Sequence, residues 1–280
     1  MTYASIVLHL DQGSHLAERT DYALELAQRL GGRITGLAAS DRTLFEMGVA
    51  TGLSLNVDLA DALEATRLRA EARAQQFADR AILVRFPDAV ATVDDNDEVV
   101  ALLNRSRCCD LMILGLPDRS GGGHARARRQ LESVLLDGVA PTLVLPQQRE
   151  LPELGGPAII GWNGSPEAAR AVAAAMPMLR NSSRVTLLRC DSAFDAERVN
   201  GLTDLDLPVE WLELHGVRCD PIVRQTSTDP GEVLLETAAD DGASLVVLGA
   251  WGHWRWSEKL LGGATELALQ RAKIPLLMSH

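Results

Sequence analysis

The sequence predicts an α/β protein built from two tandem, open, parallel five-stranded sheets with helices on both faces. Short, nearly continuous apolar runs alternate with alanine-rich helical segments, an order typical of parallel sheets whose strands are buried on both faces. The order also occurs twice, because SIVLHLDQGS at 5–14 returns as PAIIGWNGS at 157–165. A chain of 280 residues has room for two such domains.

Each repeat begins with an apolar strand, a polar turn that contains glycine, and an amphipathic helix. The apolar positions of both helices recur at the 3.6-residue period that places them on one face. In the first repeat this face consists of Leu16, Thr20, Ala23, Leu24, Ala27 and Leu30, and in the second of Ala168, Ala171, Val172, Ala175 and Leu179. A second strand follows each helix, at 33–39 and at 184–190.

The ends of the two repeats also correspond. Helices are expected at 94–107 and 229–241, and Asp229 followed by Pro230 is a favourable helix start, with an N-cap acceptor before proline at N1. The last two strands of each repeat are expected in CDLMILGLPDR and VAPTLVLP, and in ASLVVLGAWGH and KIPLLMSH. These boundaries predict domains at 1–148 and 157–280, joined by a linker at 149–156 that contains proline and glycine.

The middles of the repeats differ. The first contains a long helical stretch at about 57–85 and, before it, a glycine-spotted apolar segment at 43–56 that could form a flap over the sheet. The second has only a short piece at about 207–216.

The composition of the chain bears on whether it binds nucleic acid or a membrane and on the state of its cysteines. A formal net charge of −11 opposes binding to nucleic acid. No signal peptide is evident and no apolar run approaches the roughly 20 residues that span a bilayer, so we expect a cytoplasmic protein without a membrane partner. The four cysteines favour reduced thiols, although the adjacent Cys108 and Cys109 leave a redox-active pair open.

Glycines near the end of the second repeat indicate an anion site. Ligands of open parallel sheets bind beyond the carboxyl ends of the strands. Gly249 and Gly252 end an apolar strand there, and 262–265 (GGAT) opens the final helix. Glycine lets the backbone approach phosphate oxygens, and free N–H groups at a helix start attract the anion. A hydroxyl from Thr265 could join them.

The spacing G-x2-G-x9-G formed by Gly249, Gly252 and Gly262 resembles the nucleotide-binding loop of the universal stress protein family. The resemblance extends over both repeats and is to the tandem-domain bacterial type. It implies an adenine nucleotide alpha hydrolase-like fold that binds ATP or another adenine nucleotide. The candidate nucleotide-binding residues are Asn163, Gly164, Ser165, Val223, Gly249, Gly252, His253, Gly262, Gly263, Ala264 and Thr265.

The chain also departs from the family pattern. Asn163 stands where binding members have an aspartate, which leaves a role for Mg²⁺ open. Trp251 places a bulky side chain between the two glycines. The side chains of His253, Trp254 and Trp256 could stack on a ligand or cover the sheet edge.

The first repeat is expected to be a degenerate site. It keeps Asp11, but Pro117, Asp118 and Arg128 follow its fourth strand where the glycine pattern would be. Its basic loop at 119–129 is interpreted as a solvated segment, with a local anion contact as the alternative. The acidic run at 94–98 is interpreted as helix capping rather than as a cation site.

We therefore expect a stress-response regulator or binding protein that binds a nucleotide through its second domain. No catalytic residue and no metal site can be named, so an enzyme is disfavoured. A slow ATP hydrolase and a nucleotide-free scaffold or apolar-ligand binder are the alternatives. The closing strands at 139–146 and 273–280 are apolar, which predicts that the two repeats pair with each other through them as an intra-chain pseudo-dimer. Pairing of two chains as a homodimer is the alternative.

Overall fold

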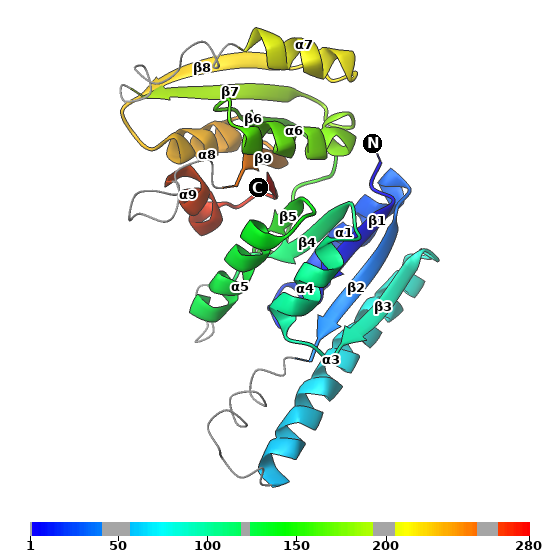
Figure 1. Cartoon of the computed structure of the whole chain (residues 1–280). Helices are drawn as coiled ribbons and strands as arrows, with labels where there is room; N and C mark the ends of the chain where they lie inside the picture. Colours follow the sequence, from blue (N-terminus) through cyan, green and yellow to red (C-terminus); the bar gives the residue numbers. More distant parts are fainter. Residues whose placement is uncertain (1, 41–56, 119–123, 193–204, 251–262) are drawn as a thin grey trace. The chain divides into compact units, whose positions relative to one another are not determined.

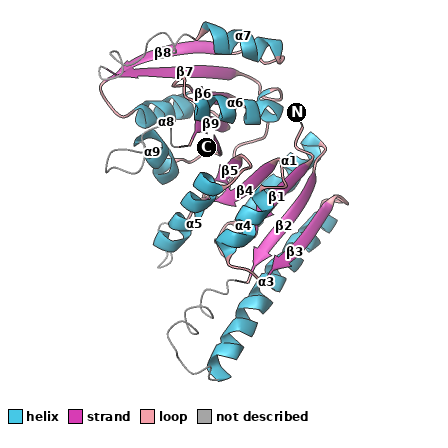
Figure 2. Cartoon of the chain, in the orientation of Figure 1, coloured by secondary structure: helices cyan, strands magenta, loops and turns pink. Residues whose placement is uncertain are grey.

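A computed structural model describes residues 2–40, 57–118, 124–192, 205–250 and 263–280. These residues form two compact units, Thr2–Ala140 and Pro141–His280 (Figure 1). Each unit is a sheet with helices packed against its strands (Figure 2). The segment at 43–56, considered above as a flap, lies outside the described residues.

The first unit has a wholly parallel sheet in the order β3-β2-β1-β4. Strand β1 is central and its residues 6–9 are buried, as the apolar run predicts. Its strands are β1 (Ser5–His9), β2 (Arg33–Ala39), β3 (Ala89–Asp94) and β4 (Leu111–Gly115). Its helices are α1 (Leu16–Leu30), α3 (Val57–Leu83), α4 (Glu98–Ser106) and α5 (His124–Asp137).

The helices of the first unit pair up by face. Helix α1 contacts α3, and α4 contacts α5. The connections from β1 to β2 and from β2 to β3 run across the sheet in one direction, and the connection from β3 to β4 runs back in the other. Because such crossovers are right-handed, the two helix pairs lie on opposite faces of the sheet. The carboxyl ends of β1, β2 and β4 therefore share one edge of a sheet that is covered on both sides.

The second unit repeats this arrangement and adds a strand, in the order β5-β10-β9-β6-β7-β8. All neighbours are parallel except β5 and β10. Its strands are β5 (Thr142–Leu145), β6 (Ala158–Gly161), β7 (Val185–Ser192), β8 (Asp220–Thr226), β9 (Leu245–Gly249) and β10 (Leu276–Ser279). Its helices are α6 (Pro166–Leu179), α7 (Asp206–Leu214), α8 (Pro230–Asp240) and α9 (Gly263–Arg271).

Strand β5 corrects the expected division into two separate five-stranded sheets. It closes the first sequence repeat, yet it pairs antiparallel with β10, with Leu143 opposite Leu277. Both side chains are fully buried. The predicted contact between the two closing strands is thus present, and it gives the second unit six strands. The repeat boundaries at 1–148 and 157–280 remain a prediction about the sequence.

Most predicted elements appear close to their expected bounds. The long helix expected at about 57–85 is α3, and the short piece expected at about 207–216 is helix α7. Asp229 caps α8, where its carboxylate accepts a hydrogen bond from the Gly231 amide at 2.7 Å. None of the helices that the structure describes is long and apolar enough to cross a bilayer.

Candidate functional site

Helices α6 and α9 begin beside the end of strand β9, and helix α8 begins against the start of α9. The first turn of α6 lies against Gly249, where a Cβ atom would stand 2.6 Å from the backbone nitrogen of Ala168. The Thr265 hydroxyl, from the first turn of α9, donates to the Gly249 carbonyl at 3.5 Å. A Cβ on Gly231, at the start of α8, would stand 2.6 Å from Cα of Ala264. Glycine at 249 and 231 is what lets these helix starts approach so closely.

The turn that leads into α6 is ordered by its own side chains. The Asn163 Oδ1 atom accepts a hydrogen bond from the Ser165 amide at 3.1 Å, and Gly164 adopts a φ of 73°. The Ser165 hydroxyl then accepts from the Ala168 amide at 3.1 Å and caps the helix. Asn163 is exposed, so its side-chain amide group lies at the surface of the strand end.

Asp229 serves two helix starts at once. Its Oδ1 atom accepts the Gly231 amide of α8, and its Oδ2 atom lies against Gly263, the first residue of α9. The contact is so close that a Cβ atom at Gly263 would overlap the carboxylate. A negative charge here is favourable because the N-termini of both helices carry partial positive charge.

Glu167 places a second carboxylate at this strand end. It lies in the first turn of α6 against Gly249 and is only 5% exposed. Its Oε1 atom pairs with Arg170 at 2.8 Å, whereas its Oε2 atom is buried without a hydrogen-bond partner. Burial alone would raise the pKa of Glu167, but the helix-start amide and Arg170 together hold that pKa below its usual value.

The arrangement is suited to binding an anion. The N-termini of α6 and α9 both lie at Gly249, and the partial positive charge of helix N-termini attracts anions such as phosphate. No group of three His, Cys, Asp or Glu side chains that could hold a metal occurs in the described parts of the chain.

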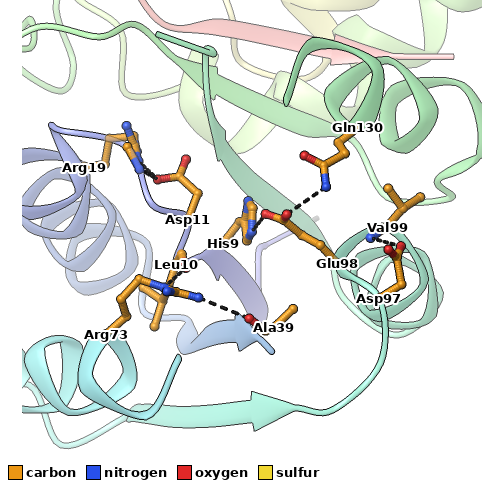
Figure 3. Close-up of polar contacts among 11 residues, drawn as sticks. His9, Leu10, Asp11, Arg19, Ala39, Arg73, Asp97, Glu98, Val99 and Gln130 are labelled. Carbon is orange, nitrogen blue, oxygen red and sulfur yellow. Dashed lines mark hydrogen bonds and ion pairs between the residues drawn. The ribbon is translucent and has the colours of Figure 1, made fainter. Parts of the chain in front are cut away.

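The corresponding strand ends of the first unit are filled by the protein's own side chains (Figure 3). Arg19 of α1 is fully buried and pairs with Asp11, which follows β1. Its guanidinium group lies over Gly115 at the end of β4, where a Cβ atom would stand 2.6 Å from Arg19 Cζ. A cation of the chain thus sits in the first unit where the start of α6 meets Gly249 in the second.

Buried His9 forms a pair with the partly buried Glu98 beside Arg19. The His9 Nε2 atom lies 2.6 Å from the Glu98 carboxylate, and Gln130 of α5 donates to the same carboxylate at 2.8 Å (Figure 3). Burial alone would lower the pKa of His9. The charge and the hydrogen bond of the Glu98 carboxylate have a larger opposite effect, so the pKa of His9 is raised. Burial likewise favours a raised pKa for Glu98, yet His9 and Gln130 lower it to about 2.

Arg73 of α3 closes the same edge. Its guanidinium group donates to the Leu10 carbonyl at 2.8 Å and to the Ala39 carbonyl at 3.1 Å (Figure 3). These carbonyls follow β1 and end β2, so the carboxyl ends of two strands are capped from within. Side chains of the chain thus satisfy the strand ends that would otherwise face a ligand.

Comparison with known proteins agrees with this geometry. Residues 157–280 match the model of the universal stress protein family. The match covers the second sequence repeat and is a similarity to that family. No curated protein shows significant sequence similarity to the chain.

Solved universal stress proteins share the fold of the whole chain. One from Archaeoglobus fulgidus DSM 4304 aligns over 100% of this chain and 99% of its own, with 15% identity and a TM-score of 0.73. A protein from Pseudomonas aeruginosa UCBPP-PA14 that is described as a universal stress protein aligns over 99% and 93%, with 14% identity and a TM-score of 0.61. The first unit therefore shares the universal stress protein fold, although the family match covers only the second repeat.

The structure brings together most of the described residues that the sequence places in a nucleotide site. The turn of Asn163, Gly164 and Ser165 meets Gly249 through the start of α6, and 263–265 meets it through α9. The Thr265 hydroxyl is engaged by the Gly249 carbonyl. Val223 lies on strand β8 with 46% exposure and takes no part in these contacts.

Some sequence predictions for the site fall on residues outside the described parts of the chain. They concern Gly252, Gly262 and the side chains of Trp251, His253, Trp254 and Trp256. The interpretation of 119–129 as a solvated loop also falls partly outside, since residues 119–123 are not described.

The acidic run at 94–98 divides into two roles. Asp97 caps α4, with its carboxylate accepting the Val99 amide at 2.9 Å, so the capping interpretation is right for this residue (Figure 3). Glu98 instead pairs with His9, which the sequence analysis does not anticipate.

The sequence does contain signals for the side chains that were missed. His9 interrupts the apolar strand IVLHL, and a polar residue inside a doubly buried strand needs a partner. Arg19 falls three residues after Leu16 on the apolar face of its helix, and Glu167 falls four before Ala171 on the apolar face of α6. Charged residues on apolar faces are therefore the signal that would have found them.

Proposed function

We propose that the second unit binds an adenine nucleotide and that the chain is a nucleotide-linked regulator in a stress response. The observation that supports binding best is that the N-termini of α6 and α9 both lie at Gly249, with the start of α8 packed against the start of α9. Backbone N–H groups at such a place bind phosphate without needing a basic side chain. Similarity of residues 157–280 to the universal stress protein family supports the cellular role.

The glycine spacing adds independent support. Gly249 ends β9, and Gly263 opens α9 at the far side of the loop that the G-x2-G-x9-G pattern spans. ATP and related adenine nucleotides are the ligands that the family resemblance suggests. Participation of Mg²⁺ stays open, because Asn163 brings no charge to the turn.

We further propose that the first unit does not bind a nucleotide. The Arg19 guanidinium group lies over Gly115 and is neutralised by Asp11, so a phosphate would have to displace a buried ion pair. The sequence argument against a site in the first repeat depends on Pro117, Asp118 and Arg128. The buried Arg19 is a stronger reason, because Arg128 is engaged by Glu132 of its own helix at 2.5 Å.

Nucleotide that co-purifies with the full chain provides the first test. The protein is denatured, and the released small molecules are identified by chromatography with ultraviolet detection. Titration calorimetry with adenine nucleotides then measures the dissociation constant. Gly252→Glu should abolish binding, because it adds a negative charge within the glycine pattern. Absence of any nucleotide binding by the wild-type chain would contradict the proposal and favour a nucleotide-free scaffold.

Binding is proposed in preference to hydrolysis. Hydrolysis would need, beyond binding, a group that positions the attacking water and charges that stabilise the transferring phosphoryl group, whereas binding needs only the helix N-termini. Phosphate release measured with wild-type protein and Gly252→Glu separates the two functions. Release that disappears in the variant would establish the slow ATP hydrolase instead.

The repeats are proposed to pair as an intra-chain pseudo-dimer through their closing strands. The antiparallel pair of β5 and β10 supports this, with Val144 opposite Leu276 and Thr142 opposite Met278. Small-angle scattering of the full chain would test it, because repeats that are free of one another would give a more extended particle.

A further inference from the structure

We infer that the chain forms a two-fold symmetric homodimer through its first unit, in which helix α3 pairs antiparallel with α3 of a second copy and strand β3 pairs with its own counterpart. The inference concerns the first unit alone and does not depend on the proposed nucleotide binding. It follows from an apolar stripe on α3, from the unprotected edge of β3, and from the level at which the two lie.

Helix α3 exposes apolar side chains on both sides of a central glutamine. Leu68 and Ile82 are 54% and 72% exposed, and each lies seven residues from the exposed Gln75. Residues seven apart lie on nearly the same side of a helix, so these three form one stripe. Two such stripes match when they run antiparallel, because Leu68 of each copy then meets Ile82 of the other and Gln75 lies on the two-fold axis.

The stripe lies on the flank of α3 that faces away from β1 and α1. On the opposite flank Arg73 donates to a carbonyl that follows β1, and Arg80 pairs with a carboxylate of α1. Gln75 and Ile82 each come two residues after one of these arginines, which is about 200° around the helix. Helix α3 packs on β2 and β3 (Figure 1), so the stripe lies on the side of the free edge of β3.

Strand β3 presents an edge without the usual protection. Among the described strands it pairs with β2 alone, and its sequence AVATVD has no proline and carries a charge only at Asp94. Val90 adds a side chain that is 38% exposed. The matching edge strand of the second unit, β8, contains Pro221 and Arg224. Proline and charged side chains keep edge strands from pairing with other chains, so β8 is protected and β3 is open to pairing.

The helix stripe and the strand edge can share one two-fold axis. Phe77 of α3 lies over Gly36 of β2, where a Cβ atom would stand 2.8 Å from its ring, and Gly36 is level with Ala91 of β3. Helix α3 runs antiparallel to β3, because a short turn joins them. Gln75, two residues before Phe77, therefore lies about 3 Å further toward the carboxyl end of β3, which is the level of Thr92. An axis that relates the two copies of Gln75 thus also relates the two copies of Thr92.

The charges beside the stripe are met within each helix. Glu71 pairs with Arg67 at 3.1 Å, and Asp79 accepts a hydrogen bond from the side-chain amide of Gln75 at 2.8 Å. A single polar residue within an apolar stripe also fixes the register of a helix pair. Gln75 is therefore suited to hold the two copies in the antiparallel register that joins Leu68 to Ile82.

Sedimentation equilibrium of the full chain tests the inference. The wild-type chain should be dimeric at about 100 µM, as expected for an interface of one helix pair and one strand pair. Leu68→Glu and Ile82→Glu should each raise the dissociation constant of the dimer at least about tenfold, because each sets two carboxylates against apolar side chains. Leu214→Glu is the matched control, since Leu214 lies on α7 of the second unit with 78% exposure, and it should leave this constant unchanged.

Cysteine cross-linking tests the register. Gln75→Cys places the thiols of the two copies together on the axis, so mild oxidation should yield more covalent dimer than the wild-type chain with its own four cysteines. Leu68→Cys should yield no more than the wild type, because its two copies would lie about 20 Å apart along the helices. Circular dichroism melts check that each variant is folded, as expected for exposed positions. A wild-type monomer at every concentration, a dimer unaffected by both glutamates, or equal cross-linking by Leu68→Cys and Gln75→Cys would overturn the inference.

Discussion

Arg19 shows what one residue does to the first repeat. Its guanidinium group is fully buried, neutralised by Asp11 and packed over Gly115. At the equivalent strand end of the second unit the backbone nitrogen of Ala168 lies against Gly249, whose missing Cβ lets the helix start come close to the strand. A single long cation therefore fills in one repeat the space that a helix N-terminus approaches in the other.

Replacing Arg19 by Met should destabilise the first unit, because it leaves Asp11 without its cation. We expect a loss of roughly 3 kcal/mol in the free energy of unfolding, the lower end for breaking a buried ion pair, since Asp11 is partly exposed. Urea denaturation followed by circular dichroism measures it. The double variant with Asp11→Asn should recover part of the loss, and a double variant as unstable as the single one would contradict this explanation.

The pair of His9 and Glu98 should make stability depend on pH. The pKa of His9 is raised, so its contribution is complete below about 6.5 and is lost as the pH rises through the higher folded value. The pKa of Glu98 is about 2, so its contribution is present above about 4.5 and is lost as the pH falls toward 2. The two contributions coexist between about pH 4.5 and 6.5.

We therefore expect the free energy of unfolding, measured by urea denaturation, to fall between pH 6 and about pH 9, as His9 loses its proton, by an amount on the order of 1–2 kcal/mol. Asp11, Arg19, Gln130 and Arg126 also face or influence this pair. His9→Gln should remove this part of the pH dependence. A variant with an unchanged pH profile would show that another group is responsible.

At the scale of elements, the turn at 163–165 and the start of helix α6 are held together by hydrogen bonds. Asn163 orders the turn, Ser165 caps the helix, and the start of that helix packs against the end of β9. The side chain at 163 can therefore change charge without losing its structural hydrogen bond, because an aspartate oxygen accepts from the Ser165 amide equally well.

Asn163→Asp separates metal-dependent from metal-free binding. If a divalent metal bridges the ligand to the protein, the restored carboxylate should tighten binding in Mg²⁺ by about 1–2 kcal/mol, the size of a charged hydrogen bond. In EDTA the same substitution should weaken nucleotide binding, since it adds a negative charge near the phosphate. Calorimetry in both conditions makes the comparison. Equal affinities for wild type and variant in both would place residue 163 outside the site.

At the scale of the molecule, strand β5 ties the end of the first sequence repeat into the second unit. Leu143 and Leu277 are opposite one another and fully buried. Without β5, strand β10 would present its backbone N–H and C=O groups along an apolar edge. Exposed edges of this kind recruit another strand.

A fragment of residues 157–280 should therefore self-associate through β10 more readily than a fragment of residues 141–280, in which β5 covers β10. Light scattering after size-exclusion chromatography gives the two masses. A monomeric 157–280 fragment would contradict the role given to β5.

The sequence by itself determined the order of elements, because strands and helices are encoded by local periods of apolar residues. The central runs of β1 and β9, the faces of α1 and α6, and the cap at Asp229 could all be predicted. The repeated glycine and polar turns also predicted where a ligand would bind, since strand ends of a parallel sheet share one edge.

Only the tertiary structure decided which partner each buried charge and each closing strand takes. Arg19 over Gly115, Asp229 against Gly263, and β5 on β10 all join segments far apart in the chain. A charged side chain on a helix has the same local pattern whether it meets solvent or a buried carboxylate. An apolar strand can likewise pair with either neighbour. The physical reason is that burial and charge pairing depend on what surrounds a side chain, which local sequence periods do not encode.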